Sequence, residues 1–271
     1  MPISKRIDIA RKAFDKKDLE KTKIAHTKKA IASSVHKHHA DETHGGGGKY
    51  LGDFVYGSID GIVTTFAVVS GVTGASLSVN IILILGFANL IADGLSMAVG
   101  NFLSIKAGRE FVEKERKREE WEIENYPKGE IEEIREIFKK KGFSGKALES
   151  AVKIITSNKK IWIDTMMKEE LELISDNKSA VKGALATYAA FVSLGLIPLL
   201  AYILSYFIPF FNQNTFLIAI VATLLTLFLV GVLKIYITKL SWLRSGMETM
   251  LIGGLAATAS YGIGYFVSLL V

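Results

Sequence analysis

The chain has 271 residues, of which 49% are hydrophobic, and its mean hydropathy is +0.31, which excludes an ordinary soluble domain. It contains no cysteine, which excludes disulfides, thiolate metal sites and iron–sulfur clusters. Its net charge of +6 is concentrated in residues 1–52, where 12 Lys and Arg stand against 6 Asp and Glu. This excess favours contact with an anionic membrane surface, and we expect no nucleic-acid partner.

The segment over residues 1–49 is polar and ends in four consecutive glycines before Lys49. Its first residues, MPISKRIDIARKAFDKK, lack an apolar core of signal-peptide length and are expected to form a short basic amphipathic helix. The segment is interpreted either as a solvated tail or as a weak binder of transition metals. It holds all five histidines: His26, His36, His38, His39 and His44.

Five apolar blocks follow, each long enough to cross the hydrocarbon core of a bilayer, for which about 20 residues suffice. The third block ends at Pro209, and FFNQN is expected to turn the chain before the fourth. The predicted membrane spans are Phe54–Val72, Val79–Ser104, Val181–Ile208, Phe216–Leu233 and Met250–Val271.

A charged segment separates the second span from the third. From Ile105 the sequence KAGREFVEKERKREEWEIENY is predicted to continue the second span as a helix. Tyr126-Pro127 should break that helix, because proline disfavours the helical conformation in the residue before it. Further helices are predicted over EIEEIREIFKKK, Lys146–Thr156 and Lys160–Ile174.

The distribution of charge predicts the orientation. The turns at residues 74–80 and 210–214 carry no charge, whereas the tail, the charged segment and residues 234–244 carry nearly all the Lys and Arg. By the positive-inside rule, the N-terminus and the charged segment face the cytoplasm, and the C-terminus lies on the other side. The expected divisions are 1–49 (tail), 50–104 (spans 1 and 2), 105–178 (cytoplasmic helical insert) and 179–271 (spans 3 to 5).

The first two spans carry polar residues that are costly in a membrane and therefore point to function. Asp53 and Asp60 are seven residues apart and share one helix face. Lys234 and Lys239 lie at a span end, so no basic partner is expected at mid-depth for Asp60 or for the acid at position 93, whereas Asp53 could reach the aqueous boundary. The second span carries a stripe with a spacing of four: Asn89, Asp93, Met97 and Asn101.

Unpaired acids at that depth must be protonated or accompanied by a cation, which suits a carrier that exchanges protons for metal ions. The alternative is a structural hydrogen bond or ion pair between spans. We interpret Asp53, Asp60, Asn89, Asp93, Met97 and Asn101 as lining a transport path.

The insert carries a pattern of candidate metal ligands that is less specific than the acids of the spans. Glu119 and Glu122 are three residues apart, as are Glu130 and Glu133, so each pair lies on one helix face. The pair Met166-Met167 precedes Glu170 by about one turn, and thioether ligands shift preference from Mg²⁺ or Ca²⁺ towards softer metals such as Fe²⁺. Such spacing is more often a solvated helix face, and a methionine pair is more often packing.

The stretch YGSIDGIVTTFAVVSGVTGA, followed by GFANLIADGLSMAVGNFLS, resembles the first two spans of the vacuolar iron transporter family. The resemblance covers about residues 50–271. It implies a proton-coupled antiporter that exports cytosolic Fe²⁺, and often Mn²⁺, as a homodimer with its pore at the dimer interface and a cytoplasmic metal-binding domain. It implies pore roles for Asp53, Asp60 and Met97.

The resemblance also implies that the insert binds metal. Where many relatives carry membrane glutamates, this chain has Asn89 and Asn101, and Asp93 lies on the same face. The implied metal ligands of the insert are Glu119, Glu122, Glu130, Glu133, Met166, Met167 and Glu170.

The sequence thus predicts an all-α, five-span membrane protein with a cytoplasmic helical metal-binding insert between spans 2 and 3. We expect a transporter of Fe²⁺ in iron homeostasis, not an enzyme, with no organic cofactor. The alternatives are a membrane-anchored metal sensor or buffer, a primarily Mn²⁺ transporter, and a ferritin-type oxidoreductase, which the lack of histidine beyond His44 disfavours. A prokaryotic cell membrane is expected rather than a vacuolar one.

Overall fold

A computed structural model describes residues 49–173, 178–234 and 241–270, together with residues 24 and 27. The histidine-bearing tail lies outside these residues. Within them the elements are all helices, which confirms the predicted class, and five helical segments are long and apolar enough to cross a membrane. These are α4 (Leu51–Gly74), α5 (Val79–Asn125), α9 (Ala180–Gly195) with α10 (Ile197–Ser205), α11 (Pro209–Leu233) and α13 (Trp242–Ser268).

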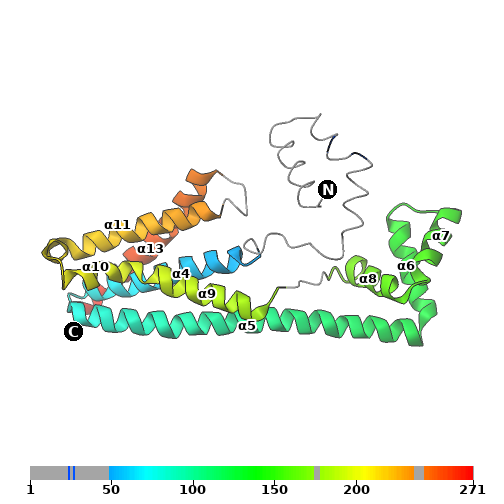
Figure 1. Ribbon diagram of the computed structural model, residues 1–271, viewed down its shortest axis with the longest axis horizontal. Helices are drawn as coiled ribbons and strands as arrows, with labels where there is room; N and C mark the ends of the chain where they lie inside the picture. Colours follow the sequence, from blue (N-terminus) through cyan, green and yellow to red (C-terminus); the bar gives the residue numbers. More distant parts are fainter. Residues whose placement is uncertain (1–23, 25–26, 28–48, 174–177, 235–240, 271) are drawn as a thin grey trace.

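Helix α5 runs along the whole molecule (Figure 1). Its 47 residues make a helix about 70 Å long, so the apolar second span and the charged stretch beyond Ile105 are one continuous element, as predicted. The helix ends at Asn125, where Tyr126 leaves the helical conformation and Pro127 begins the next helix. The spanning helices gather at one end of α5 and the insert helices at the other (Figure 1).

The insert consists of α6 (Pro127–Lys140), α7 (Gly145–Thr156) and α8 (Lys159–Glu169), packed against the far end of α5. Asn158 caps α8, because its side chain accepts hydrogen bonds from the backbone N–H groups of Lys160 and Ile161. Apolar side chains from all four helices form a separate core, which contains Ile123, Ile134, Leu148, Val152, Trp162, Ile163, Met166 and Met167.

The helices differ in detail from the predicted spans. The third span is two helices, because Pro198 lies in the first turn of α10 and cannot donate the backbone hydrogen bond that would continue α9. FFNQN is helical and not a loop: α11 begins at Pro209, and the helix is kinked at Asn214, the last residue of that stretch. Helix α13 begins at Trp242, ahead of the predicted span start at Met250.

Helix α4 is the centre of the spanning bundle and contacts α9, α13, α11, α5 and α10. Its glycines let neighbouring backbones approach closely. A Cβ atom on Gly57 would lie 2.4 Å from the carbonyl oxygen of Thr187, and one on Gly61 would lie 2.4 Å from that of Phe191, both on α9. Small residues at a spacing of four are the usual device for close packing of membrane helices. The α4–α9 contact is therefore backbone against backbone.

Substitution of Gly61 by alanine should destabilise the bundle by about 1–3 kcal/mol, since the new methyl group meets a backbone that cannot move aside. The measurement is the midpoint of thermal unfolding of the purified protein in detergent. Gly100→Ala is the matched control, because a Cβ atom there meets nothing within 4 Å. Equal midpoints for the two variants would contradict the close-packing interpretation.

Candidate functional site

The first group of candidate residues lies between α4 and α5. Asp60 on α4 and Asp93 on α5 are both half-buried, and their carboxyl groups are close enough to interact electrostatically. Among the residues that the structure describes, neither forms an ion pair. Asp60 and Asp93 thus interact inside the spanning bundle, and no basic partner of either is found among the described residues.

Polar side chains surround this acid pair. The side-chain amide of Asn89 donates a hydrogen bond to the Thr64 hydroxyl (3.4 Å), which in turn donates to the backbone carbonyl of Asp60 (2.8 Å). Met97 is half-buried and packs against the apolar core of the bundle. The predicted stripe on α5 thus meets the polar face of α4 at Asn89 and Asp93, whereas Met97 makes packing contacts.

Asp53 lies in a second polar cluster, two turns away from Asp60 on α4. Asp53 is 8% exposed, so its side chain is held inside the chain and does not extend to solvent. Its Oδ1 atom accepts hydrogen bonds from Lys178 Nζ (2.7 Å) and from Asn101 Nδ2 (3.1 Å). Asn101 Nδ2 also donates to Thr187 Oγ1 (2.8 Å), which ties α5 to α9.

Sequence reasoning missed Lys178 and Thr187 as members of this cluster. Lys178 directly precedes the third span and was grouped with the insert, although a lysine at a span end can reach back to an acid at the same depth of a neighbouring span. Thr187 has no sequence signal of its own, since threonine is common in apolar spans.

The five predicted glutamates of the insert are brought together from α5, α6 and the end of α8. Glu119 and Glu130 are 1% and 5% exposed, and they interact electrostatically with Glu122, Glu133 and Glu170. Burial, reinforced by the charge of Glu170, raises the pKa of Glu119 to about 7. Burial and the charge of Glu133 raise the pKa of Glu130 to about 7 as well. Each carboxyl is therefore poised to exchange a proton near neutral pH.

The negative charge of the insert glutamates is partly balanced by Arg118. Its guanidinium forms ion pairs with Glu115, Glu119 and Glu122. The geometry at Glu119 is not that of a hydrogen bond, and both of its carboxylate oxygens are buried without a hydrogen-bond partner among the described residues. Buried carboxylate oxygens in that condition are available to a proton or a cation.

The structure does not assemble a finished metal site from these groups. No three His, Asp or Glu side chains in the described part of the chain are arranged to hold a metal ion together. Met166 and Met167 are 0% and 4% exposed and belong to the apolar core of the insert, in agreement with the packing alternative. The seven insert ligands implied by the resemblance remain a prediction.

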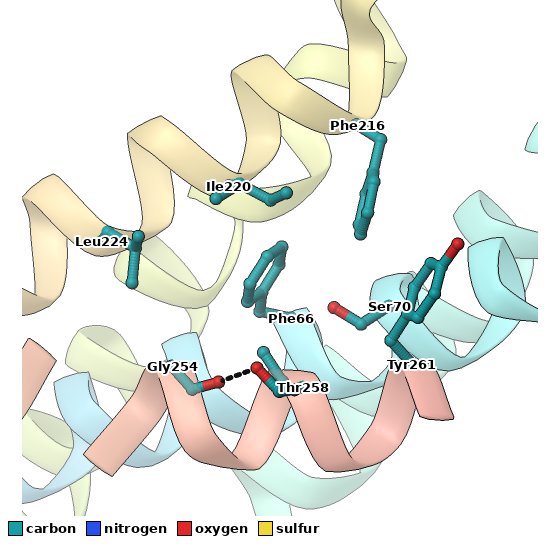
Figure 2. Close-up of a pocket in the computed structure, with 9 residues that line it drawn as sticks. Phe66, Ser70, Phe216, Ile220, Leu224, Gly254, Thr258 and Tyr261 are labelled. Atoms are coloured by element: carbon teal, nitrogen blue, oxygen red, sulfur yellow. Dashed lines mark hydrogen bonds between the residues drawn. The ribbon is translucent and has the colours of Figure 1, made fainter. Parts of the chain in front are cut away.

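A cavity of about 290 Å³ between α4, α11 and α13 is a poor candidate for a cation site. Figure 2 shows the rings of Phe66, Phe216 and Tyr261 around it, and the hydrogen bond drawn there joins Thr258 to the carbonyl of Gly254. The Ser70 hydroxyl is buried beside it without a hydrogen-bond partner in the described residues. The cavity contains no carboxylate, so the candidate cation groups are Asp60 with Asp93, Asp53, and the insert glutamates.

Comparison with known proteins supplies the family. A protein of Toxoplasma gondii (strain ATCC 50861 / VEG) named vacuolar iron transporter is 36% identical over 97% of this chain and 88% of its own length. A protein of the same name from Plasmodium berghei (strain Anka) is 35% identical over 94% of each chain. Vacuolar iron transporter 1 of Arabidopsis thaliana is 34% identical over 82% of this chain and 88% of its own.

These relatives are transporters by name, which confirms the expectation that the chain is not an enzyme. They are eukaryotic and named as vacuolar, so the expectation of a prokaryotic cell membrane has no support from them. The model of the VIT family matches residues 51–265, which span all five membrane-crossing segments and the insert. The chain is therefore a multi-pass membrane protein of the VIT family.

Proposed function

We propose that the chain exports Fe²⁺ from the cytosol in exchange for protons, and that it also carries Mn²⁺. Metal-ion transport follows from its family. The relatives' printed names support iron as the cargo. The observation that carries the proposal is the pair Asp60 and Asp93, which interact electrostatically inside the spanning bundle and have no basic partner among the described residues.

The proposed coupling rests on the cost of charge in a membrane. Two carboxylates close together in a low-dielectric region cannot both stay charged without a counter-ion. Either protons neutralise Asp60 and Asp93, or a divalent cation does so. These two states are mutually exclusive, and a carrier that alternates between them exchanges protons for metal. Asn89 and Thr64 supply uncharged polar atoms beside the pair.

The insert is proposed to collect ions before transport. Its five glutamates gather at the far end of α5, and Glu119 and Glu130 are buried with carboxylate oxygens that have no hydrogen-bond partner among the described residues. Divalent ions that displace protons from these groups would concentrate near the membrane surface. We propose that the N-terminus and insert face the cytoplasm, in keeping with the many Lys and Arg residues that they carry.

The proposed assembly is a homodimer. Asp60 and Asp93 are only half-buried in one chain, and α5 exposes apolar side chains such as Ile91 and Leu95 beside them. Half-exposed acids are unfavourable against lipid. A second copy packed on this side would cover them and would bring equivalent acids towards one axis.

A metal sensor or buffer is the second candidate, favoured by the distance between the two sites. The insert glutamates lie outside the bundle and could bind metal whether or not ions cross the membrane. Saturable binding of Mn²⁺ by the full chain, with no ion flux in liposomes, would support this candidate and contradict transport.

Replacement of Asp60 by alanine should reduce Fe²⁺ uptake into proteoliposomes to the level of empty liposomes, because the acid pair then cannot hold a divalent ion. The assay is anaerobic uptake driven by an imposed pH gradient, with Mn²⁺ as competitor to compare the two cargoes. Asp164→Ala is the control, since Asp164 is an exposed acid of the insert paired with Arg116. Wild-type uptake by the Asp60 variant would contradict the proposal.

Metal binding by the insert should weaken as the pH falls. The pKa values of Glu119 and Glu130 are raised to about 7, so protons compete with metal below that pH. We expect the Kd for Mn²⁺, measured calorimetrically on the full chain, to rise roughly tenfold per pH unit below pH 7 for each proton displaced. Glu119→Gln with Glu130→Gln should remove this dependence, whereas Glu136→Gln, an exposed acid paired with Lys139, should not.

The raised pKa values of Glu119 and Glu130 also determine how the stability of the metal-free insert changes with pH. Both folded-state pKa values exceed the usual value of 4.5, so between about pH 4.5 and 7 the folded protein binds more protons than the unfolded chain. The metal-free insert should therefore become more stable as the pH drops through that window. A thermal midpoint that rises with pH over this range would contradict the assignment.

A further inference from the structure

The cluster around Asp53 joins three helices through one carboxylate. Its Oδ1 atom accepts from Lys178 and from Asn101, and Asn101 links onward to Thr187. Thr187 Oγ1 in turn donates a hydrogen bond to the backbone carbonyl of Gly183 (3.1 Å). Asp53 Oδ1 is thus the start of a connected set of hydrogen bonds.

The other carboxylate oxygen of Asp53 is in a different environment. Asp53 Oδ2 is buried and has no hydrogen-bond partner among the described residues. It faces Gly183, where an added Cβ atom would lie 3.4 Å away. A buried carboxylate oxygen without a partner is costly, and it requires an explanation such as a water or an ion. Asp53 thus has one oxygen held by an ammonium group and one that remains available as a ligand.

Lys178 is held close to Asp53 by its neighbour in the chain. The backbone N–H of Ser179 donates to the Tyr50 hydroxyl (3.1 Å), which fastens the start of α9 to the residue that precedes α4. The side chain of Lys178 is 20% exposed against 9% for that of Asp53. The ammonium group therefore lies at the edge of the buried cluster, and its flexible four-carbon stem can carry it outwards.

A groove that is open to the surface lies beside this point. It has a volume of about 350 Å³ and is bordered by Ser179, Ala180 and Val181, which directly follow Lys178 in the chain. Glu110 and Glu113 of α5 line its other side, together with Lys106 and Arg109. The groove offers a displaced ammonium group two carboxylates, Glu110 and Glu113.

We propose that Lys178 is a tethered cation that occupies Asp53 until a divalent metal ion displaces it, and that it thereby sets the affinity of the path for its cargo. The inference rests on the proposed transport function. Without metal, the ammonium balances the buried carboxylate; with metal, Asp53 ligates the ion through Oδ2 and then through both oxygens, while Lys178 moves towards the groove. Lys178 is a positioning residue, and Asp53 is the ligand.

Competition between Lys178 and the metal ion for Asp53 weakens metal binding and makes release of the metal easier. A carboxylate that must give up an ammonium partner binds an incoming cation less tightly than one that is vacant, because the ion pair must first be broken. Asn101 contributes a neutral donor, so the cluster of Asp53 and Lys178 carries no net charge before the metal arrives. Removal of the lysine should therefore tighten metal binding at Asp53.

The test is a double-mutant cycle on Mn²⁺ uptake into proteoliposomes, with Lys178→Gln, Asp53→Asn and the double variant. We expect Lys178→Gln to lower the KM for Mn²⁺ roughly tenfold and to slow maximal uptake, because release becomes harder. In the Asp53→Asn background the same change should leave KM unaltered. Lys178→Arg should keep KM near the wild-type value, and Lys182→Gln is the control, since Lys182 is exposed one turn further along α9.

An unchanged KM with slower uptake and a lowered thermal midpoint would overturn the proposal, because Lys178 would then only brace α9 against α4. Equal effects of Lys178→Gln in both backgrounds would overturn it as well. If wild-type liposomes take up no Mn²⁺, the proposed transport function fails. The inference is then judged by the Kd of Mn²⁺ for the full chain in detergent: a decrease in Lys178→Gln that requires Asp53 supports it, and no decrease overturns it.

Discussion

The close backbone contact between α4 and α9 is the constraint on which the spanning bundle depends. Gly57 and Gly61 bring α4 against the carbonyl oxygens of Thr187 and Phe191, at a distance that any side chain would prevent. Gly195 at the end of α9 continues the contact from the other side. Because the two backbones are this close, the side chain of Asp53 reaches Lys178 and the residues around it, so packing determines the polar contacts.

Two acids on the same helix consequently have different electrostatic environments. Asp53 is buried and its charge is balanced by Lys178. Asp60 lies two turns away, half-buried, with Asp93 as its electrostatic neighbour and no ion pair among the described residues. In the proposed function, the acid balanced by Lys178 admits the cargo, and the pair without a counter-charge couples its movement to protons.

Local sequence signals predicted the elements whose causes are local. Apolar length identified five spans, and the Tyr126-Pro127 step was recognised as the end of α5. FFNQN was expected to turn the chain, and the kink at Asn214 does lie in it, but the stretch is helical because Pro209 fits the first turn of α11. Asp60 and Asp93 were both picked out as acids in apolar spans, but their electrostatic interaction with each other was not predicted.

The features that the sequence did not predict depend on contacts between segments that are distant in the chain. Lys178 and Asp53 are 125 residues apart, and only the packing of α9 on α4 brings them together. Met166 and Met167 fit both ligation and packing by their spacing, and burial in the apolar core of the insert favours packing. The raised pKa values of Glu119 and Glu130 likewise come from the fold, because burial is their largest cause.

The uninterrupted length of α5 limits direct coupling between the two groups of acids. Asp93 and Glu119 are separated along this one helix by about 39 Å, several times the Debye length of about 8 Å at physiological ionic strength. An ion bound at one end therefore exerts little direct electrostatic effect on a group at the other. Any coupling between the insert and the bundle has to pass through the polypeptide that connects them.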